Sequence, residues 1–274
     1  MATCPLCQAA HRVTYYRGTR SGDVHRCTAC GFVYADPRGE RVAGGPPART
    51  DEPAVYLENA RHRLGLLRRY GGVAGGRLLD VGCYDGGFLL AAQQLGFAGT
   101  GVEPSARGAA LARERGLTIV AAPFERAEFA APFDAITFIH SLEHFENPRQ
   151  ALSLARRHLQ PNGALLVEVP NFAAWSRPLL GRRWRQFIAD HHQFFEPPTL
   201  HRCLAEAGFA VREMRPVSKI LSLGLLADRV ERYYNLKAGR ALAGLLARRR
   251  WTEKQISLNL GDILLAVATV ARER

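Results

Sequence analysis

The chain has 274 residues and a mass of 30.2 kDa, with 47% hydrophobic residues, 23% charged residues and a formal net charge of +12. This composition excludes a disordered or fibrous chain, and the length suits one large domain or one domain with a small appendage. No apolar run reaches the roughly 18 to 20 residues that a membrane span needs, and residues 1–10 lack a secretory signal pattern. A cytoplasmic location is therefore expected.

The positive charge is unevenly distributed. Residues 1–50 carry a net charge of +4, residues 51–211 carry +1, residues 212–250 carry +7, and the remainder is neutral. A basic surface can bind nucleic acid. Because the long central segment is nearly neutral, nucleic acid is not the expected partner, although the charge pattern leaves it open.

Four of the six cysteines form two C-x2-C pairs separated by nineteen residues. Two such turns can close a tetrahedral shell of four thiolates around a structural Zn²⁺ ion, and Gly31 can supply the positive φ that the second turn needs. Redox dithiols or disulfides are the alternative, but a cytosolic chain of this length does not need disulfides. The predicted metal ligands are Cys4, Cys7, Cys27 and Cys30.

Residues 1–37 are accordingly predicted to form a small zinc-ribbon module. Residues 13–16 and 32–36 are expected to be strands of this module, and the Gly-, Pro- and charge-rich residues 38–53 are expected to be a linker. The remaining two cysteines, Cys83 and Cys203, lie among apolar residues and are expected to be small core side chains.

The rest of the chain, residues 54–274, alternates strand-like apolar runs with helical segments. This alternation predicts an α/β fold with a Rossmann-like, doubly wound sheet. A sixth strand follows residues 204–211, and a seventh, expected to be antiparallel, lies within residues 256–272 after a helical insertion over 217–251. The expected strands before these are 78–81, 99–104, 117–120, 133–140 and 164–170, and the expected helices are 54–70, 88–96, 105–116 and 148–159.

A glycine-rich turn, DVGCYDGG, follows the first of these strands and opens a helix. Small residues at such a turn allow a cofactor to approach the backbone and the helix N-terminus. Glu103 ends the next strand, where a carboxylate can accept hydrogen bonds from the two hydroxyls of a ribose. The turn carries no basic residue for a pyrophosphate and begins with Asp80, which favours a cofactor with an amino group over one with phosphates.

Together, LLDVGCYDGG, GVEPS and the stretch from FDAITFIHSLEH to LLVEVPN resemble the motifs of class I S-adenosylmethionine-dependent methyltransferases, over residues 52–214. With the N-terminal cysteines, the chain resembles a bacterial subgroup found among sugar and secondary-metabolite methyltransferases. The resemblance implies S-adenosyl-L-methionine as cofactor, with Glu103 at the ribose, Asp80 at the amino acid end and Phe124 or Glu125 at the adenine. Tyr84 departs from the family, which usually has a small residue there. The cofactor-binding residues implied are Asp80, Gly82, Cys83, Tyr84, Gly86, Glu103, Pro104, Phe124, Glu125 and His140.

Histidines are the candidates for removing a proton from an acceptor hydroxyl, because their pKa lies near neutrality. His140 and His144 follow the fourth strand in HSLEH, which also matches the H-x-x-E-H zinc-protease pattern. That pattern requires its histidines on a helix, whereas these follow a strand, so we reject a protease. Each histidine could instead shape the loop or contact the cofactor. His192 belongs to a second candidate set, expected to line the acceptor pocket unless its aromatics simply pack the loop: Trp184, His191, His192, Phe194 and Phe195.

The basic insertion, residues 217–251, has apolar residues on one side and Arg on the other. It could be a lid, a dimer contact or a peripheral surface for anionic lipid, or simply a solvated helical face. The expected function is methyl transfer to a small-molecule acceptor, a sugar or natural-product intermediate, by in-line O-methylation with a histidine base. The alternatives are an RNA methyltransferase that uses the zinc module and basic surface, and a non-catalytic zinc-ribbon adaptor with a vestigial cofactor fold.

Overall fold

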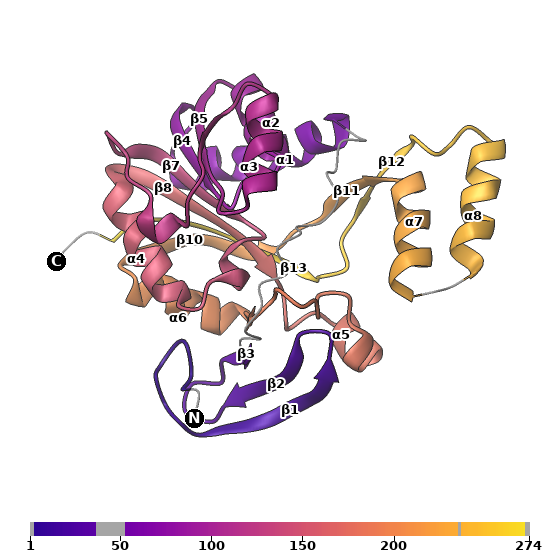
Figure 1. The fold of residues 1–274 in the computed structure, drawn as a ribbon, viewed down its shortest axis with the longest axis horizontal. Coiled ribbons are helices and arrows are strands. Elements are labelled where there is room, and N and C mark those ends of the chain that lie inside the picture. The colour runs from indigo at the N-terminus through magenta and orange to yellow at the C-terminus, as the bar shows by residue number, and fades with distance from the viewer. Residues whose placement is uncertain (1–2, 37–52, 235–236, 272–274) are drawn as a thin grey trace.

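The computed structural model describes residues 3–36, 53–234 and 237–271. A seven-stranded sheet with the order β10-β13-β8-β7-β4-β5-β6 forms its centre (Figure 1). The five strands from β4 to β8 are parallel, whereas β13 (Ile263–Val270) runs antiparallel to both β8 and β10 (Phe209–Pro216). The predicted Rossmann-like sheet with an antiparallel last strand is therefore confirmed. The parallel strands are β4 (Gly76–Val81), β5 (Phe97–Val102), β6 (Thr118–Val120), β7 (Phe133–Ile139) and β8 (Leu159–Pro170).

Helices cover both faces of this sheet (Figure 1). One face packs against α1 (Pro53–Gly71), α2 (Gly87–Gln94) and α3 (Ala106–Glu114), and the other against α4 (Pro148–His158) and α6 (Pro197–Glu206). Alternate residues of a strand enter opposite cores because side chains alternate across a sheet. In β8, Leu166 joins the first core, while Leu165 and Val167 join the second.

The N-terminal module is continuous with the main domain. Its strands β1 (Arg12–Thr19), β2 (Gly22–Cys27) and β3 (Val33–Ala35) form a four-stranded sheet with β9 (Gln193–Phe194), which follows β8 in the main domain. The strands at 13–16 and 32–36 were predicted, but β2 and β9 were not. The predicted linker falls mostly on residues 37–52, which lie outside the described residues, and α1 begins at Pro53.

The aromatic residues between the two units form their shared core. Trp184, Phe194 and Phe195 are at most 1% exposed, and Phe187 packs with Trp184 and Phe194 against Val33 of the ribbon. The prediction that these aromatics line an open acceptor pocket is wrong for Trp184, Phe194 and Phe195. These apolar rings pack instead against the apolar face of the small ribbon sheet. This packing removes more of their surface from water than a position in the wall of an open pocket would.

The predicted insertion is a helical hairpin carried on a two-stranded stalk. The strands β11 (Lys219–Ser222) and β12 (Gln255–Leu258) pair antiparallel, and α7 (Leu223–Tyr234) and α8 (Lys237–Arg248) extend from them away from the central sheet (Figure 1). Asn59 of α1 anchors the stalk, because its side chain donates to the Ile220 carbonyl and accepts from the Ile220 N–H. None of the described helices is long and apolar enough to cross a membrane.

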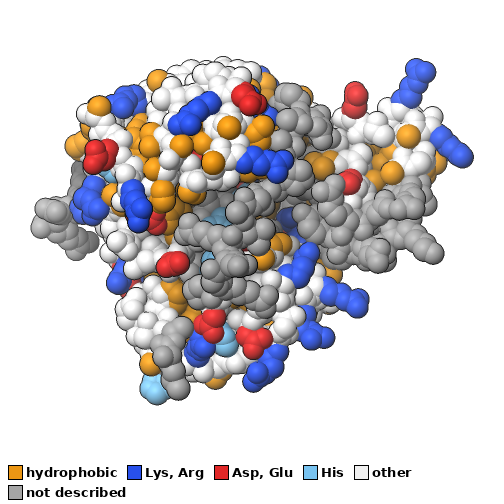
Figure 2. Space-filling model, viewed as in Figure 1, with side chains coloured by type: hydrophobic (Ala, Val, Ile, Leu, Met, Phe, Trp, Pro, Cys, Tyr) orange, Lys and Arg blue, Asp and Glu red, His pale blue; other side chains and the backbone are white. Residues whose placement is uncertain are grey.

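The surface shown in Figure 2 carries basic side chains scattered among acidic ones. On the one face that Figure 2 shows, the described part of the central domain carries no continuous basic surface. This agrees with the near-neutral charge of residues 51–211.

Candidate functional site

Three residues of the turn after β4 have a positive φ, which is the left-handed conformation that glycine favours. Gly82, Tyr84 and Gly86 have φ values of 74°, 48° and 72°. A Cβ atom on Gly82 would lie 2.7 Å from Cβ of Ser141, and one on Gly86 would lie 2.1 Å from Leu117 Cδ1. The backbone conformation therefore favours glycine at both positions, and at Gly82 the Cβ of Ser141 also leaves no space for a side chain.

Tyr84 keeps the left-handed conformation although it is not glycine. This conformation costs a residue with a Cβ about 1–2 kcal/mol. The Tyr84 N–H donates to Oε2 of Glu103 at 2.9 Å, which contributes to holding the turn in place. The departure from the family pattern at this position therefore leaves the turn intact.

Glu103 lies at the end of β5, next to this turn. Its Oε1 accepts from the Ser105 N–H at 2.8 Å, so backbone donors orient both carboxylate oxygens. Burial raises the pKa of Glu103, and the two backbone donors oppose that shift. Each oxygen has a second lone pair, so the carboxylate fits the two hydroxyls of a ribose.

Asp80 lies in β4, buried beneath the same turn. The Thr137 hydroxyl donates to its Oδ1 at 2.7 Å. Burial raises the pKa of Asp80 to about 7, against the effect of the Thr137 hydrogen bond. Among the residues that the structure describes, no cationic side chain pairs with Asp80. The ionised form of such a buried carboxyl is stabilised when a positively charged group binds beside it, so Asp80 fits the ammonium group of an amino acid.

The other predicted cofactor residues lie around the same strand ends. Cys83 is buried, and its Sγ would lie 2.5 Å from a Cβ on Gly101. Pro104 is exposed directly after Glu103, and Glu125 is exposed on the turn Phe124–Arg126 after β6.

Phe124 differs from these residues because its ring is 2% exposed. It packs against Phe138 and Phe145 in the core. A contact between Phe124 and an adenine would therefore have to come from its backbone. The role of this residue stays a prediction.

His140 lies directly after β7, between two buried carboxylates. Its Nε2 is 3.0 Å from Oε1 of Glu168, and its Nδ1 is 3.6 Å from Oε1 of Glu143. Glu168 also receives two hydrogen bonds of 2.6 Å from the guanidinium of Arg63 on α1. Burial favours the neutral acid, but Arg63 and His140 outweigh it and hold the pKa of Glu168 well below its usual range.

His144 ends the short turn Leu142–His144, next to His191 from the loop that precedes β9. The His144 Nδ1–H donates to the Asp190 carbonyl at 2.6 Å, and the two rings are 4.9 Å apart. Nε2 of His191 is 3.7 Å from Oε1 of Glu143. Burial lowers the pKa of His191 to about 3, although Glu143 opposes this shift. His191 is therefore neutral at physiological pH.

His192 is tied into the backbone that joins the ribbon to this cluster. Its N–H donates to the Glu143 carbonyl at 3.1 Å, and its own carbonyl accepts from the Ala35 N–H at 2.9 Å. The side chain is 9% exposed. The structure thus brings all three predicted catalytic histidines, His140, His144 and His192, to the region around Glu143.

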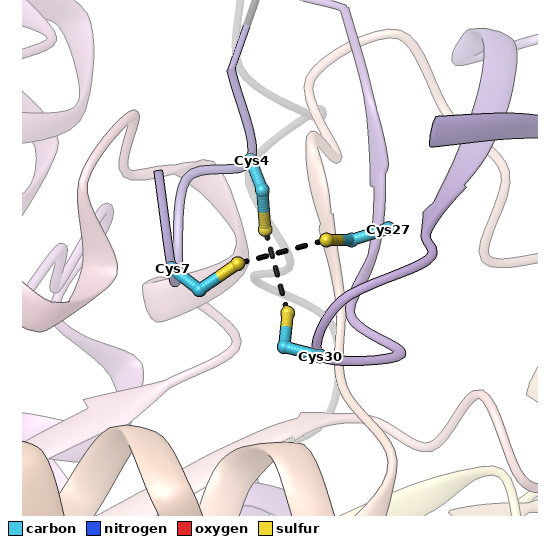
Figure 3. Close-up of side chains that lie close together, drawn as sticks. All are labelled: Cys4, Cys7, Cys27 and Cys30. Carbon is cyan, nitrogen blue, oxygen red and sulfur yellow. Dashed lines mark hydrogen bonds between the residues drawn. The ribbon is translucent and has the colours of Figure 1, made fainter. Parts of the chain in front are cut away.

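The four N-terminal cysteines converge in the ribbon (Figure 3). Cys4 Sγ is 3.6 Å from Cys30 Sγ, Cys7 Sγ is 3.6 Å from Cys27 Sγ, and all four sulfurs lie within 4.8 Å of one another. A tetrahedral ion with Zn–S bonds of about 2.3 Å would place its sulfurs about 3.8 Å apart. All four are free thiols, so the arrangement fits a metal ion and argues against the disulfide alternative. The other two cysteines, Cys83 and Cys203, are also free and buried.

Residues 55–214 match the model of a family described as a methyltransferase domain. The chain belongs to this methyltransferase family. The match covers more than half of the chain and contains the glycine-rich turn, Glu103 and the histidines up to His192. The methyltransferase therefore uses S-adenosylmethionine, as the motifs predicted, and the adaptor alternative is set aside.

Two similar relatives of the methyltransferase are named ubiquinone biosynthesis O-methyltransferases. The protein from Alkalilimnicola ehrlichii is 32% identical over 74% of this chain and 83% of its own length. The protein from Aromatoleum aromaticum is 29% identical over 59% of this chain and 78% of its own length. A solved methyltransferase from Thermotoga maritima, described as a possible histamine N-methyltransferase, matches 80% of this chain and 92% of its own with a TM-score of 0.52 and 20% identity. That likeness shows the fold.

Three buried charged residues of the methyltransferase site were not predicted from the sequence: Arg63, Glu143 and Glu168. Glu168 interrupts an otherwise apolar strand, and a charge in such a position indicates a buried partner. The partner, Arg63, is 105 residues away in the sequence, so only the fold could reveal it. From the sequence, Glu143 was named only as part of the H-x-x-E-H pattern, and His191 was predicted only to line the acceptor pocket. Their contact with each other was not predicted.

Proposed function

We propose that the methyltransferase transfers the methyl group of S-adenosylmethionine to a hydroxyl oxygen of a small molecule. The observation that carries this proposal is the cluster of histidines around Glu143, next to the glycine-rich turn. Ser141 of this cluster lies directly against Gly82. The names of the relatives and the near-neutral charge of residues 51–211 support a small acceptor over a polynucleotide.

The residues of the turn would hold the cofactor, which supplies a methyl group on a sulfonium when bound. Glu103 would accept hydrogen bonds from the ribose hydroxyls, Asp80 would face the ammonium group, and Gly82 and Gly86 would allow the cofactor to approach the backbone. Pro104 and Glu125 would lie at the outer end of this site. Each role follows from the position and charge of the residue.

The geometry favours His144 as the group that receives the acceptor proton. Its Nδ1–H is used by the Asp190 carbonyl, so Nε2 keeps a free lone pair on a half-buried ring. Both nitrogens of His140 face carboxylates, and His192 is almost fully buried. The acceptor O–H proton would pass to Nε2 of His144 as the O–CH₃ bond forms and the C–S bond breaks.

The four-cysteine ribbon would hold a structural Zn²⁺ ion that keeps β3 folded against β9. We also propose that the acceptor is a sugar or natural-product intermediate, or, as the names of the relatives suggest, an intermediate of ubiquinone biosynthesis. The insertion carrying α7 and α8 would contact a second copy or an anionic lipid surface, or cover the acceptor.

The test is to incubate the purified protein with methyl-labelled S-adenosylmethionine and a cell extract, and to separate the small-molecule fraction from the RNA fraction. Label is expected in small molecules and lost in Glu103→Gln. Label confined to RNA would overturn the proposal and favour the RNA alternative. Base hydrolysis of the labelled small molecules would then release label from methyl esters, and extraction at acidic pH would separate the protonated methylated amines from the ethers.

A further inference from the structure

We propose that Glu143, His144 and His191 form a second metal site, which binds a divalent transition-metal ion such as Zn²⁺ or Mn²⁺. The ion would hold the oxygen of the acceptor beside the glycine-rich turn. This last part rests on the proposed function, whereas the binding of the ion does not. The site is separate from the four cysteines of the ribbon.

The three side chains have the spacing that one ion requires. Their ligand atoms all lie within 4.8 Å of one another, and Oε1 of Glu143 is 3.7 Å from Nε2 of His191. Two atoms that bind the same ion at about 2.0–2.2 Å lie about 3 to 4.4 Å apart.

Glu143 provides an independent indication that a cation belongs here. Its side chain is fully buried, and neither carboxylate oxygen has a hydrogen-bond partner among the described residues. An ionised carboxylate without hydrogen bonds in the interior is costly, and such groups are normally hydrogen-bonded, paired or bound to a metal. A divalent ion would satisfy both oxygens.

The two histidines present suitable lone pairs. Because His144 donates its Nδ1–H to the Asp190 carbonyl, its Nε2 is free to bind an ion. Metal-binding histidines usually donate their other ring N–H to a carbonyl or carboxylate in this way. Nε2 of His191 faces Glu143, 3.7 Å from its Oε1, on the side where the ion would bind.

The type of ligand selects the class of ion. Two imidazoles and one carboxylate leave a coordination position open, as in catalytic zinc sites, and they suit Zn²⁺, Mn²⁺ or Fe²⁺ better than Ca²⁺ or Mg²⁺. An oxygen bound in that position loses its proton more easily. With the ion present, Nε2 of His144 would be a ligand and not the base. The bound acceptor hydroxyl would then release its proton to water, and its oxygen would form the O–CH₃ bond as the C–S bond of the cofactor breaks.

The neighbouring charges define the competing explanation. His140 lies 3.6 Å from Glu143 and 3.0 Å from Glu168, and Arg63 pairs with Glu168. A protonated His140 could balance Glu143 without any metal. The two explanations differ in the number of ions that each chain binds.

The experiment is to supply the metal-free full-length protein with one equivalent of Zn²⁺, which the four cysteines favour because thiolates prefer Zn²⁺, and then to titrate it with Mn²⁺ while free Mn²⁺ is followed by electron paramagnetic resonance. Wild type should bind one Mn²⁺ in addition to the ribbon Zn²⁺. Glu143→Gln should weaken that binding by more than about 100-fold, because the loss of an outer-shell partner alone typically costs 10- to 100-fold. Glu146→Gln, the same change at an exposed neighbour, should bind as wild type does.

His191→Gln provides a second variant in case Glu143→Gln fails to fold, and S-adenosylmethionine affinity reports the integrity of each variant. The proposal is overturned if wild type binds no Mn²⁺ beyond the ribbon ion, or if neither variant weakens the binding. If Mn²⁺ binds as expected but no small molecule is labelled, the metal site stands and the proposed function fails.

Discussion

The protonation of Asp80 should couple cofactor binding to pH. Burial raises the pKa of this carboxyl to about 7 in the free protein. The ammonium group of S-adenosylmethionine favours the ionised form, so binding below pH 7 requires Asp80 to release its proton. At pH 6 about nine-tenths of the free protein carries that proton, and binding should release about 0.9 protons. The affinity should fall about tenfold for each pH unit below 7 and level off above it.

The same shift has a consequence for the stability of the free protein. The folded pKa lies above the unfolded value of about 3.9, so the protein binds the Asp80 proton more tightly when folded. This group therefore favours folding most at low pH, and its contribution falls as the pH rises through 7. The span of about 3 pKa units corresponds to about 4 kcal/mol.

Isothermal titration calorimetry with S-adenosylmethionine from pH 6 to 8.5, in buffers with different ionisation enthalpies, measures both the affinity and the proton release. Asp80→Asn should abolish the proton release and flatten the pH dependence. Glu128→Gln, an exposed carboxyl removed in the same way, should retain both effects. A wild-type affinity that does not change between pH 6 and 7 would refute this account of Asp80.

Three further predictions concern the ribbon, the buried ion pair and the insertion. Cys27→Ala should lower methylation strongly and change the affinity for S-adenosylmethionine little. The reason is that the ribbon supports the loop that carries His191, whereas it does not support the glycine-rich turn. Equal losses of methylation and of cofactor affinity would contradict this prediction. Glu168→Gln should lower the free energy of unfolding by about 3–5 kcal/mol in urea denaturation, because it leaves Arg63 buried without its carboxylate. The double variant Arg63→Met with Glu168→Met should recover part of that loss, and no recovery would show that the pair acts through another contact. Replacing residues 223–254 by a short Gly-rich turn should leave cofactor affinity unchanged and stability within about 0.5 kcal/mol, because α7 and α8 rest mainly on each other and on their stalk; a cooperative loss of folding would show that the hairpin is part of the core.

The central sheet could be predicted because its strands carry long apolar runs with regular helices between them. The glycine-rich turn could be placed for the same reason: it follows a buried strand and begins a helix. The strands β9, β11 and β12 could not be placed, because they have only two to four residues each. Their pairing depends on neighbours that are distant in the sequence, such as Val33 with Phe194.

The histidines were predicted as candidates, but their roles could not be assigned from spacing. His140, Glu143 and His144 are close in the sequence, whereas His191 and Glu168 reach them from other segments of the chain. The distance from His191 to Glu143 and the distance from Glu168 to His140 decide which imidazole nitrogens face a carboxylate. That information lies in the packing of β7, β8 and the loop before β9, which no local pattern specifies.

The ribbon and the candidate acceptor site are joined by direct backbone contacts. The ribbon pairs β3 with β9, and the Ala35 N–H donates to the His192 carbonyl at 2.9 Å. The His192 N–H in turn donates to the backbone carbonyl of Glu143 at 3.1 Å, so two consecutive hydrogen bonds join the cysteine module to the residue that carries the buried carboxylate. Phe32, which follows the second C-x2-C pair, also packs against Phe195 at 5.2 Å between ring centroids. Because His191 immediately precedes this chain of contacts, its distance from Glu143 depends on a folded ribbon. A metal ion at the cysteines would thus fix the position of a side chain in the acceptor site without touching the acceptor.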